Sequence, residues 1–243
     1  MDSGHSSSVS RFPFAPWLTN PEQLARTLVG RDAIIRDILN RVVSAGNGAA
    51  PKHALLVGPR GMGKTHILFL IYLYISGEIK LPPDMPGPLT GWDVVFFSEE
   101  EYRGHNTLAN FLLSLIGKLK ENNPHETSWI LPQDIGEQSD EIVSQCCFER
   151  IDNYAKIHKR RILVLIDNMQ KILQQFPSAD NQSLRAYLMD RTSILFIGTA
   201  ISLFKQILDR NEPFFEFFER INISDLSQED MLKLLLAQFR EDG

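Results

Sequence analysis

Residues 53–65 read HALLVGPRGMGKT, a short apolar run followed by a glycine-rich turn. Gly58 to Thr65 satisfies the pattern G-x-x-x-x-G-K-[ST] without a gap. In this pattern the glycines let backbone N–H groups curl around a β-phosphate, Lys64 adds a compact cation, and the Thr65 hydroxyl coordinates Mg²⁺. The apolar helix predicted from residue 64 directs the positive end of its dipole at the same anion. The stretch therefore predicts a nucleotide-phosphate loop between a buried strand and a helix.

A second apolar run, RILVLID at residues 161–167, supplies an acidic strand that complements this loop. Asp167 at its carboxyl end is expected to hold Mg²⁺ together with Thr65. An aspartate that ends a buried strand is also a common turn residue, and the pairing with the phosphate loop favours the metal role. The predicted cofactors are ATP and Mg²⁺. The predicted nucleotide ligands are the loop and its continuation: Gly58, Pro59, Arg60, Gly61, Met62, Gly63, Lys64, Thr65 and His66.

Short apolar runs alternate with helical patterns along the chain, which predicts a parallel sheet covered on both faces. The expected fold class is α/β, a three-layer α/β/α sandwich with a mostly parallel five-stranded sheet. A Ser-rich and Pro-interrupted start is expected to form a flexible tail, followed by a helical segment and the nucleotide-binding core. The expected boundaries are 1–20 for the tail, 21–50 for the helical segment and 51–224 for the core. The strands are expected at 53–57, 93–97, 161–166, 193–198 and 220–223.

The composition is that of an ordinary folded domain. Of the 243 residues, 43% are hydrophobic and 23% charged, which is enough to build a core. The net charge of −5 argues against DNA binding through bulk charge alone. No run is long enough for a membrane span, and the start has no apolar region typical of a secretory signal. The only cysteines, Cys146 and Cys147, are adjacent, so a disulfide framework is excluded and a cytoplasmic protein is expected.

Five blocks occur in an order that resembles prokaryotic AAA+/STAND-like P-loop ATPases of the archaeal, origin-recognition-like type. The resemblance covers roughly residues 20–240, and the phosphate loop and acidic strand are its specific parts. The helical lid of such proteins is at most begun, because only about twenty residues follow the fifth strand; residues 225–243 are expected to start it. The blocks are LVGRDAIIRDIL (28–39), HALLVGPRGMGKTHIL (53–68), ILVLIDNMQKIL (162–173), ILFIGTA (194–200) and EPFFEFFERINISDLSQEDMLKLL (212–235).

The resemblance also implies roles for individual residues. Val29, Gly30 and Arg31 match the N-terminal box that packs near the adenine, and Thr199 matches the polar residue that senses the γ-phosphate. Either Arg210 or Arg220 is implied as an arginine finger for a neighbouring subunit, because charge on a transferring phosphoryl group often needs such a partner. A homo-oligomer or a larger protein assembly is therefore implied.

Asn168 departs from the family pattern, which has a water-activating glutamate there. An amide can orient water but cannot accept its proton as a carboxylate does. Hydrolysis is then slow, or the site is catalytically dead, or the base comes from the end of the neighbouring strand, where ligands of parallel sheets bind. The candidates are Glu99 and Glu100 in SEEEY; strand alternation would direct Glu99 and Glu101 to one side and Glu100 to the other. A solvated acidic turn is the alternative.

Two functions follow from these observations, with ATP and ADP as ligands in both. The first is an ATP–Mg²⁺-driven switch or motor acting on a protein or nucleic-acid partner, with Lys64, Asp167, Asn168, Glu99 or Glu100, and Thr199 at its centre. The alternative is a nucleotide-binding regulatory scaffold with little hydrolysis; a small-molecule kinase is a third class, disfavoured because no Arg-rich lid is evident. The basic run KIHKRR at residues 156–161 is either a nucleic-acid contact or a solvated helix end.

Overall fold

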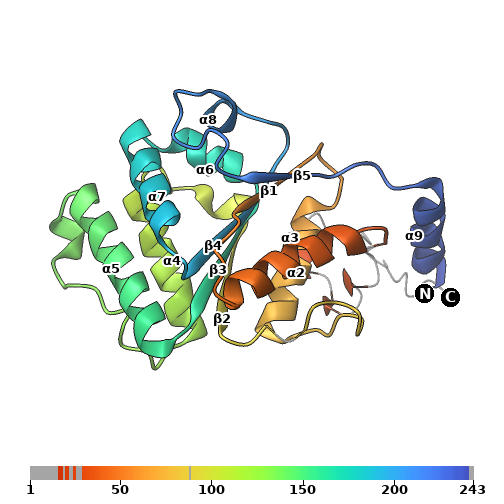
Figure 1. Ribbon diagram of the computed structural model, residues 1–243, viewed down its shortest axis with the longest axis horizontal. Helices are drawn as coiled ribbons and strands as arrows, with labels where there is room; N and C mark the ends of the chain where they lie inside the picture. The colour runs from red at the N-terminus through yellow and green to blue at the C-terminus, as the bar shows by residue number, and fades with distance from the viewer. Residues whose placement is uncertain (1–15, 19, 22–23, 26–28, 88, 241–243) are drawn as a thin grey trace, which may run out of the picture.

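Five parallel strands form one sheet at the centre of the protein (Figure 1). The computed structural model describes residues 16–18, 20, 21, 24, 25, 29–87 and 89–240, so most of the predicted 1–20 tail lies outside the described residues. The strand order is β2-β3-β4-β1-β5, and every neighbouring pair is parallel. The predicted α/β sheet is therefore confirmed. Its strands are β1 (Ala54–Val57), β2 (Trp92–Phe97), β3 (Arg161–Ile166), β4 (Ile194–Ala200) and β5 (Glu219–Asn222).

Helices cover both faces of the sheet, and the final helix lies beyond β5 at one end of the molecule (Figure 1). None of the described helices is both long and apolar enough to traverse a bilayer. The α-helices are α2 (Asp32–Gly46), α3 (Lys64–Ser76), α4 (Leu108–Asn122), α5 (Asp140–His158), α6 (Met169–Gln175), α7 (Ser178–Asp190), α8 (Lys205–Leu208) and α9 (Gln228–Arg240). The 3₁₀ turns are η1 (Pro16–Leu18), η2 (Glu99–Tyr102) and η3 (Ile135–Glu137).

Alternation along the strands divides the core into two layers, because successive strand side chains point to opposite faces. In β3, Leu163 and Leu165 pack with α2 and α3, whereas Ile162, Val164 and Ile166 pack with α4 to α7. All five are buried, so this strand has an unbroken apolar sequence rather than an alternating one. The three-layer sandwich follows from this two-sided burial.

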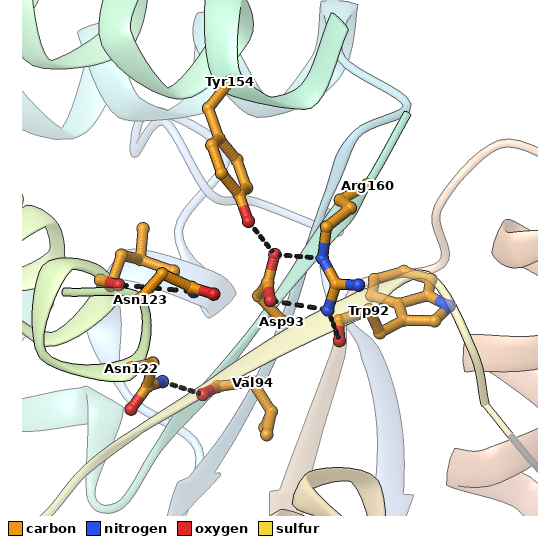
Figure 2. A network of polar contacts seen from close by, with 8 residues as sticks. Trp92, Asp93, Val94, Asn122, Asn123, Tyr154 and Arg160 are labelled. Carbon is orange, nitrogen blue, oxygen red and sulfur yellow. Dashed lines mark hydrogen bonds and ion pairs between the residues drawn. The ribbon is translucent and has the colours of Figure 1, made fainter. Parts of the chain in front are cut away.

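An ion pair between the buried Asp93 and the half-buried Arg160 ties the start of β2 to the segment that follows α5 (Figure 2). The Asp93 carboxylate is 7% exposed and accepts from Arg160 Nε at 2.7 Å and Nη2 at 2.6 Å, and from the Tyr154 hydroxyl at 2.7 Å. Arg160 Nη2 also donates to the Trp92 carbonyl at 2.7 Å. Of the predicted basic run 156–161, Arg160 is thus committed to the fold rather than to solvent or nucleic acid.

Removing one partner of this pair should be costly, because it leaves a buried charge without compensation. We expect Arg160→Ala to lower the free energy of unfolding by about 3 kcal/mol in urea titrations. Lys233→Ala is the matched control: its pair with Glu229 on α9 is exposed to solvent, so the expected loss is much smaller. Equal losses in the two variants would show that the Asp93 pair contributes nothing special.

His53, directly before β1, is buried among aromatic rings. Its ring stacks on Phe217 at a centroid distance of 5.1 Å, and its Nδ1 accepts the Phe196 N–H at 2.9 Å. Phe214 and Phe218 are buried in the same cluster. Burial lowers the pKa of His53 from 6.5 to about 4, so the ring is neutral in the folded protein at pH 7.

Because the buried His53 is neutral, the folded protein should lose stability as the pH falls. The folded-state pKa is depressed, so the unfolded chain binds more protons between about pH 6.5 and pH 4, and stability falls as the pH falls through that window. Up to about 3 kcal/mol should be lost to this residue. His53→Asn keeps an acceptor for the Phe196 N–H without a titrating ring. The difference between wild-type and variant unfolding free energies should therefore change across the window; parallel curves would refute the assignment.

Candidate nucleotide-binding site

The phosphate loop runs from β1 into the N-terminus of α3. Gly61 and Gly63 have φ of 83° and 80°, a conformation that side chains disfavour, and no atom lies within 4 Å of where their Cβ atoms would be. The loop therefore leaves an open cradle above the helix N-terminus. Lys64 Nζ donates to the Gly58 and Pro59 carbonyls, each at 2.6 Å. Burial lowers the pKa of Lys64, although the nearby Asp167 charge raises it.

Asp167, at the end of β3, is the centre of the polar site. Its carboxylate accepts from Thr65 Oγ1, which lies 3.0 Å from both oxygens, and from Thr199 Oγ1 at 2.7 Å. Thr199 in turn accepts the Asn168 N–H at 2.7 Å, and the Tyr102 hydroxyl donates to the Asp167 carbonyl. Burial raises the pKa of Asp167, and the hydrogen bonds from the two threonines oppose that rise. The structure thus brings together three predicted residues from α3, β3 and β4.

These donors suit magnesium held mainly by a nucleotide. Mg²⁺ keeps several waters and usually takes only one or two protein ligands besides phosphate oxygens. Thr65 and Asp167 supply one hydroxyl and one carboxylate at the edge of the open cradle. Among the described residues there is no cluster of three or more His, Cys, Asp or Glu side chains that would hold a metal without a nucleotide. The residue set therefore fits ATP with Mg²⁺ better than a free-standing metal centre.

Glu99 is the glutamate of SEEEY that interacts with the Asn168 side chain. The Glu99 side chain pairs with Lys171 Nζ at 2.7 Å. Burial would raise the pKa of Glu99, but hydrogen bonds from Lys171 and from the Asn168 side chain lower it. Asn168 itself is 7% exposed with φ of 48°, and its Oδ1 has no hydrogen-bond partner in the described part of the chain. Lys171 was not anticipated from the sequence; its place three residues after Asn168, in the first turn of α6, is the signal for it.

The expected alternation of the three glutamates is wrong. The strand ends at Phe97, and residues 99–102 form the 3₁₀ turn η2, so the period of two no longer applies. Glu101 folds back onto the Ser98 N–H at 3.0 Å and pairs with Lys118 at 2.6 Å. Glu100 is exposed, away from Asp167. Of the three, Glu99 alone is paired with the residues that follow Asp167.

The predicted adenine box lies beside the phosphate loop. Arg31 is buried, with Nη1 donating to the Ser224 carbonyl at 2.9 Å and Nη2 to the Met62 carbonyl at 3.3 Å. Burial lowers the pKa of Arg31, and Asp225 and Asp230 oppose this. A Cβ on Gly30 would lie 2.7 Å from the Asp230 carboxylate, so α9 approaches the backbone there. Val29, before them, is half-buried. The sequence did not indicate that Arg31 would connect the loop to the β5–α9 segment.

The remaining candidate residues are exposed or half-buried. His66 is half-buried on α3, and burial lowers its pKa. Arg60 is exposed at the loop. Arg210 and Arg220 are both exposed, and neither forms an ion pair with a described residue. At the start of α9, the Ser227 Oγ accepts the Asp230 N–H at 3.0 Å. Both arginines thus stay candidates for an arginine finger.

Comparison with known proteins identifies the fold. The Aeropyrum pernix ORC1 protein in complex with DNA has a TM-score of 0.62 and 14% identity, covering 94% of this chain and 54% of that one. The A. pernix ORC2 protein in ADPNP–ADP complexes gives 0.58 and 13%, with 86% and 50% covered. CDC6P from Pyrobaculum aerophilum gives 0.56 and 13%, with 92% and 54% covered. No protein-family model matches the sequence, and no curated protein matches it.

The chain therefore shares its three-layer α/β/α fold with these three structures. Its structural neighbours are of the origin-recognition type, as the sequence resemblance predicted. The chain spans about half the length of each of these structures. At such low identity the likeness establishes the fold alone.

Thr199 should be important for the integrity of the site. Thr199→Val removes the hydroxyl that donates to Asp167 and accepts from Asn168, so two buried polar groups lose a partner. We expect a loss of about 2 kcal/mol in the free energy of unfolding. Thr199→Ser is the matched control, since it keeps the hydroxyl and removes one methyl, with an expected loss of about 1 kcal/mol or less. The ordering of the two variants in chemical denaturation tests the hydrogen-bonding role; equal losses would contradict it.

Proposed function

We propose that the protein is an ATP–Mg²⁺-binding AAA+/STAND-like ATPase that acts as a slow nucleotide-driven switch on a partner. The observation that carries this proposal is the convergence of Lys64, Thr65, Asp167 and Thr199 around the open cradle of the phosphate loop. Each of these groups suits one part of a nucleotide complex. Lys64 and the loop amides would bind the β- and γ-phosphates. Thr65 and Asp167 would bind the metal, and the hydrogen bond from Thr199 would keep the Asp167 carboxylate in place.

Glu99 is the residue we assign as the base that activates water. A general base must carry a carboxylate or similar group near the reacting water, and Asn168 has none. Glu99 lies against Asn168. The charge of Arg60 lowers the pKa of Glu99, and the charge of Glu99 raises the pKa of Asp167. Its ion pair with Lys171 and its lowered pKa make it a weaker base, which supports slow turnover. Asn168 is left to orient the water.

Turnover measurements on three variants test this assignment. Glu99→Gln keeps the shape and removes the base, so kcat should fall about 100-fold or more. Glu100→Gln is the matched comparison from the same turn and should retain the wild-type rate. Asn168→Glu should raise kcat if the native site is tuned to be slow. Phosphate release measured with ADP formation checks all three, and an unchanged rate in Glu99→Gln would refute the assignment.

A nucleotide-binding scaffold with little hydrolysis is the second candidate. It is favoured by Asn168, which cannot accept a proton, and by the ion pair in which Lys171 holds the Glu99 carboxylate and lowers its basicity. Under this reading nucleotide binds, but wild type and all three variants release no phosphate above background. The similarity to an ORC1 protein solved with DNA makes nucleic acid one partner to include, so phosphate release should be measured with and without DNA.

Assembly is part of the proposal, because the charge on a transferring phosphoryl group often needs the positive charge of an arginine from a neighbouring subunit. Arg210 or Arg220 of a neighbouring copy would supply that charge. Solution mass with a non-hydrolysable ATP analogue addresses this point. A monomer in that state would argue against a finger supplied by a second copy.

A further inference from the structure

One edge of the sheet is formed by β2. Two hydrogen bonds show which of its residues direct their backbone groups toward β3. The Arg161 N–H donates to the Gly91 carbonyl at 2.8 Å, and the Asp167 N–H donates to the Phe97 carbonyl at 2.9 Å. Backbone groups of a strand alternate between its two neighbours. Odd-numbered residues of β2 therefore face β3, and Trp92, Val94 and Phe96 direct their N–H and C=O groups away from the sheet.

Side chains occupy the outward carbonyls at two positions of this edge, whereas the outward N–H groups of Trp92 and Val94 have no partner among the described residues. Arg160 donates to the Trp92 carbonyl at 2.7 Å, and Asn122 Nδ2 donates to the Val94 carbonyl at 3.0 Å (Figure 2). At the far end Glu101 accepts the Ser98 N–H. For Phe96, by contrast, neither the outward N–H nor the outward C=O has a partner among the residues that the structure describes. An unprotected position on a sheet edge is a template for pairing with another chain.

A groove of about 370 Å³ lies at this unprotected position. One wall is aromatic, formed by Trp17 of η1, Phe69 and Tyr72 of α3, and Phe96 itself. The rings contact one another: the Phe69–Phe96 centroids are 5.5 Å apart and the Trp17–Phe96 centroids 6.2 Å apart. The groove therefore offers an apolar surface beside one available backbone donor and acceptor.

The opposite rim of the groove is acidic. Glu100 and Glu101 from η2 and Glu121 from α4 face a single lysine, Lys118, whose Nζ is already paired with Glu101 at 2.6 Å. Two carboxylates thus have no compensating cation in the described rim. This excess repels the phosphates of nucleic acid and attracts basic groups.

We propose that this groove binds an extended segment of a partner protein that pairs with the Phe96 backbone. An aromatic or large aliphatic side chain of the segment packs against the aromatic wall, and a neighbouring Lys or Arg contacts Glu100 and Glu121. This is strand addition to a sheet edge, with side-chain pockets giving selectivity. The inference goes beyond the proposed ATPase function, since such binding needs no nucleotide. The groove nevertheless shares the turn η2 with Glu99.

Selection from a phage-displayed library of random heptapeptides, with the full chain as target, tests the inference. The double variant Glu100→Lys/Glu121→Lys serves as the counter-target, because both positions are exposed and their reversal leaves the aromatic wall intact. We expect the enriched peptides to carry an aromatic or large aliphatic residue next to Lys or Arg. A synthetic peptide of that sequence should bind the double variant about tenfold more weakly than wild type.

Amide hydrogen exchange then tests the backbone contact. On saturation with the peptide, exchange of the Phe96 amide should slow about tenfold or more, while that of Val95, which faces β3, should change little. The proposal is overturned if no sequence is enriched, if the double variant binds equally, or if the Phe96 amide is unaffected. It is also overturned if wild type forms a dimer that the double variant abolishes, or if the peptide binds only after removal of residues 1–15; those results would assign the groove to a second copy or to the chain itself.

Discussion

The buried Asp167 carboxylate is the constraint on which the site depends. It is 8% exposed, and a charge in that position persists only when hydrogen-bond donors compensate for the lost water. Thr65 and Thr199 provide the donors, one from the start of α3 and one from β4. The same bonds fix the phosphate loop relative to the sheet. A metal bound there would take over part of this compensation, which links the stability of the site to its ligand.

In the proposed mechanism Glu99, which follows the neighbouring strand, takes the role of the glutamate that the family pattern has directly after Asp167. Because β2 and β3 are parallel neighbours, their carboxyl ends meet, and a residue that follows one strand can reach the residue that follows the other. Glu99 and Asn168 make that contact. Glu99 is a weaker base than an unpaired glutamate, since Lys171 pairs with it and lowers its pKa. The arrangement suits a switch in which the nucleotide state lasts longer than in a fast hydrolase.

Much of the fold could be predicted because its signals are local. The glycine spacing of the loop, the unbroken apolar strands and the helix beginning at Lys64 each depend on adjacent residues, and the structure confirms them. The directions of the three glutamate side chains could not be predicted, because the strand ends before Ser98. The capping bonds between Ser98 and Glu101 favour a 3₁₀ turn there. The partners of Arg31 and Arg160 could not be predicted either, since they lie far away in the sequence. Local patterns specify the elements, and long-range polar contacts orient the side chains between them.

The central claim is that the loop and Asp167 form one ATP–Mg²⁺ site. Calorimetric titration with a non-hydrolysable ATP analogue, with Mg²⁺ and with a chelator, tests it most directly. The wild-type chain should bind at least about tenfold more tightly with Mg²⁺ than without it, Asp167→Asn should lose most of that difference, and Lys64→Ala should bind weakly in both conditions. Equal binding by wild type and Lys64→Ala, or an affinity that does not respond to Mg²⁺, would contradict the claim.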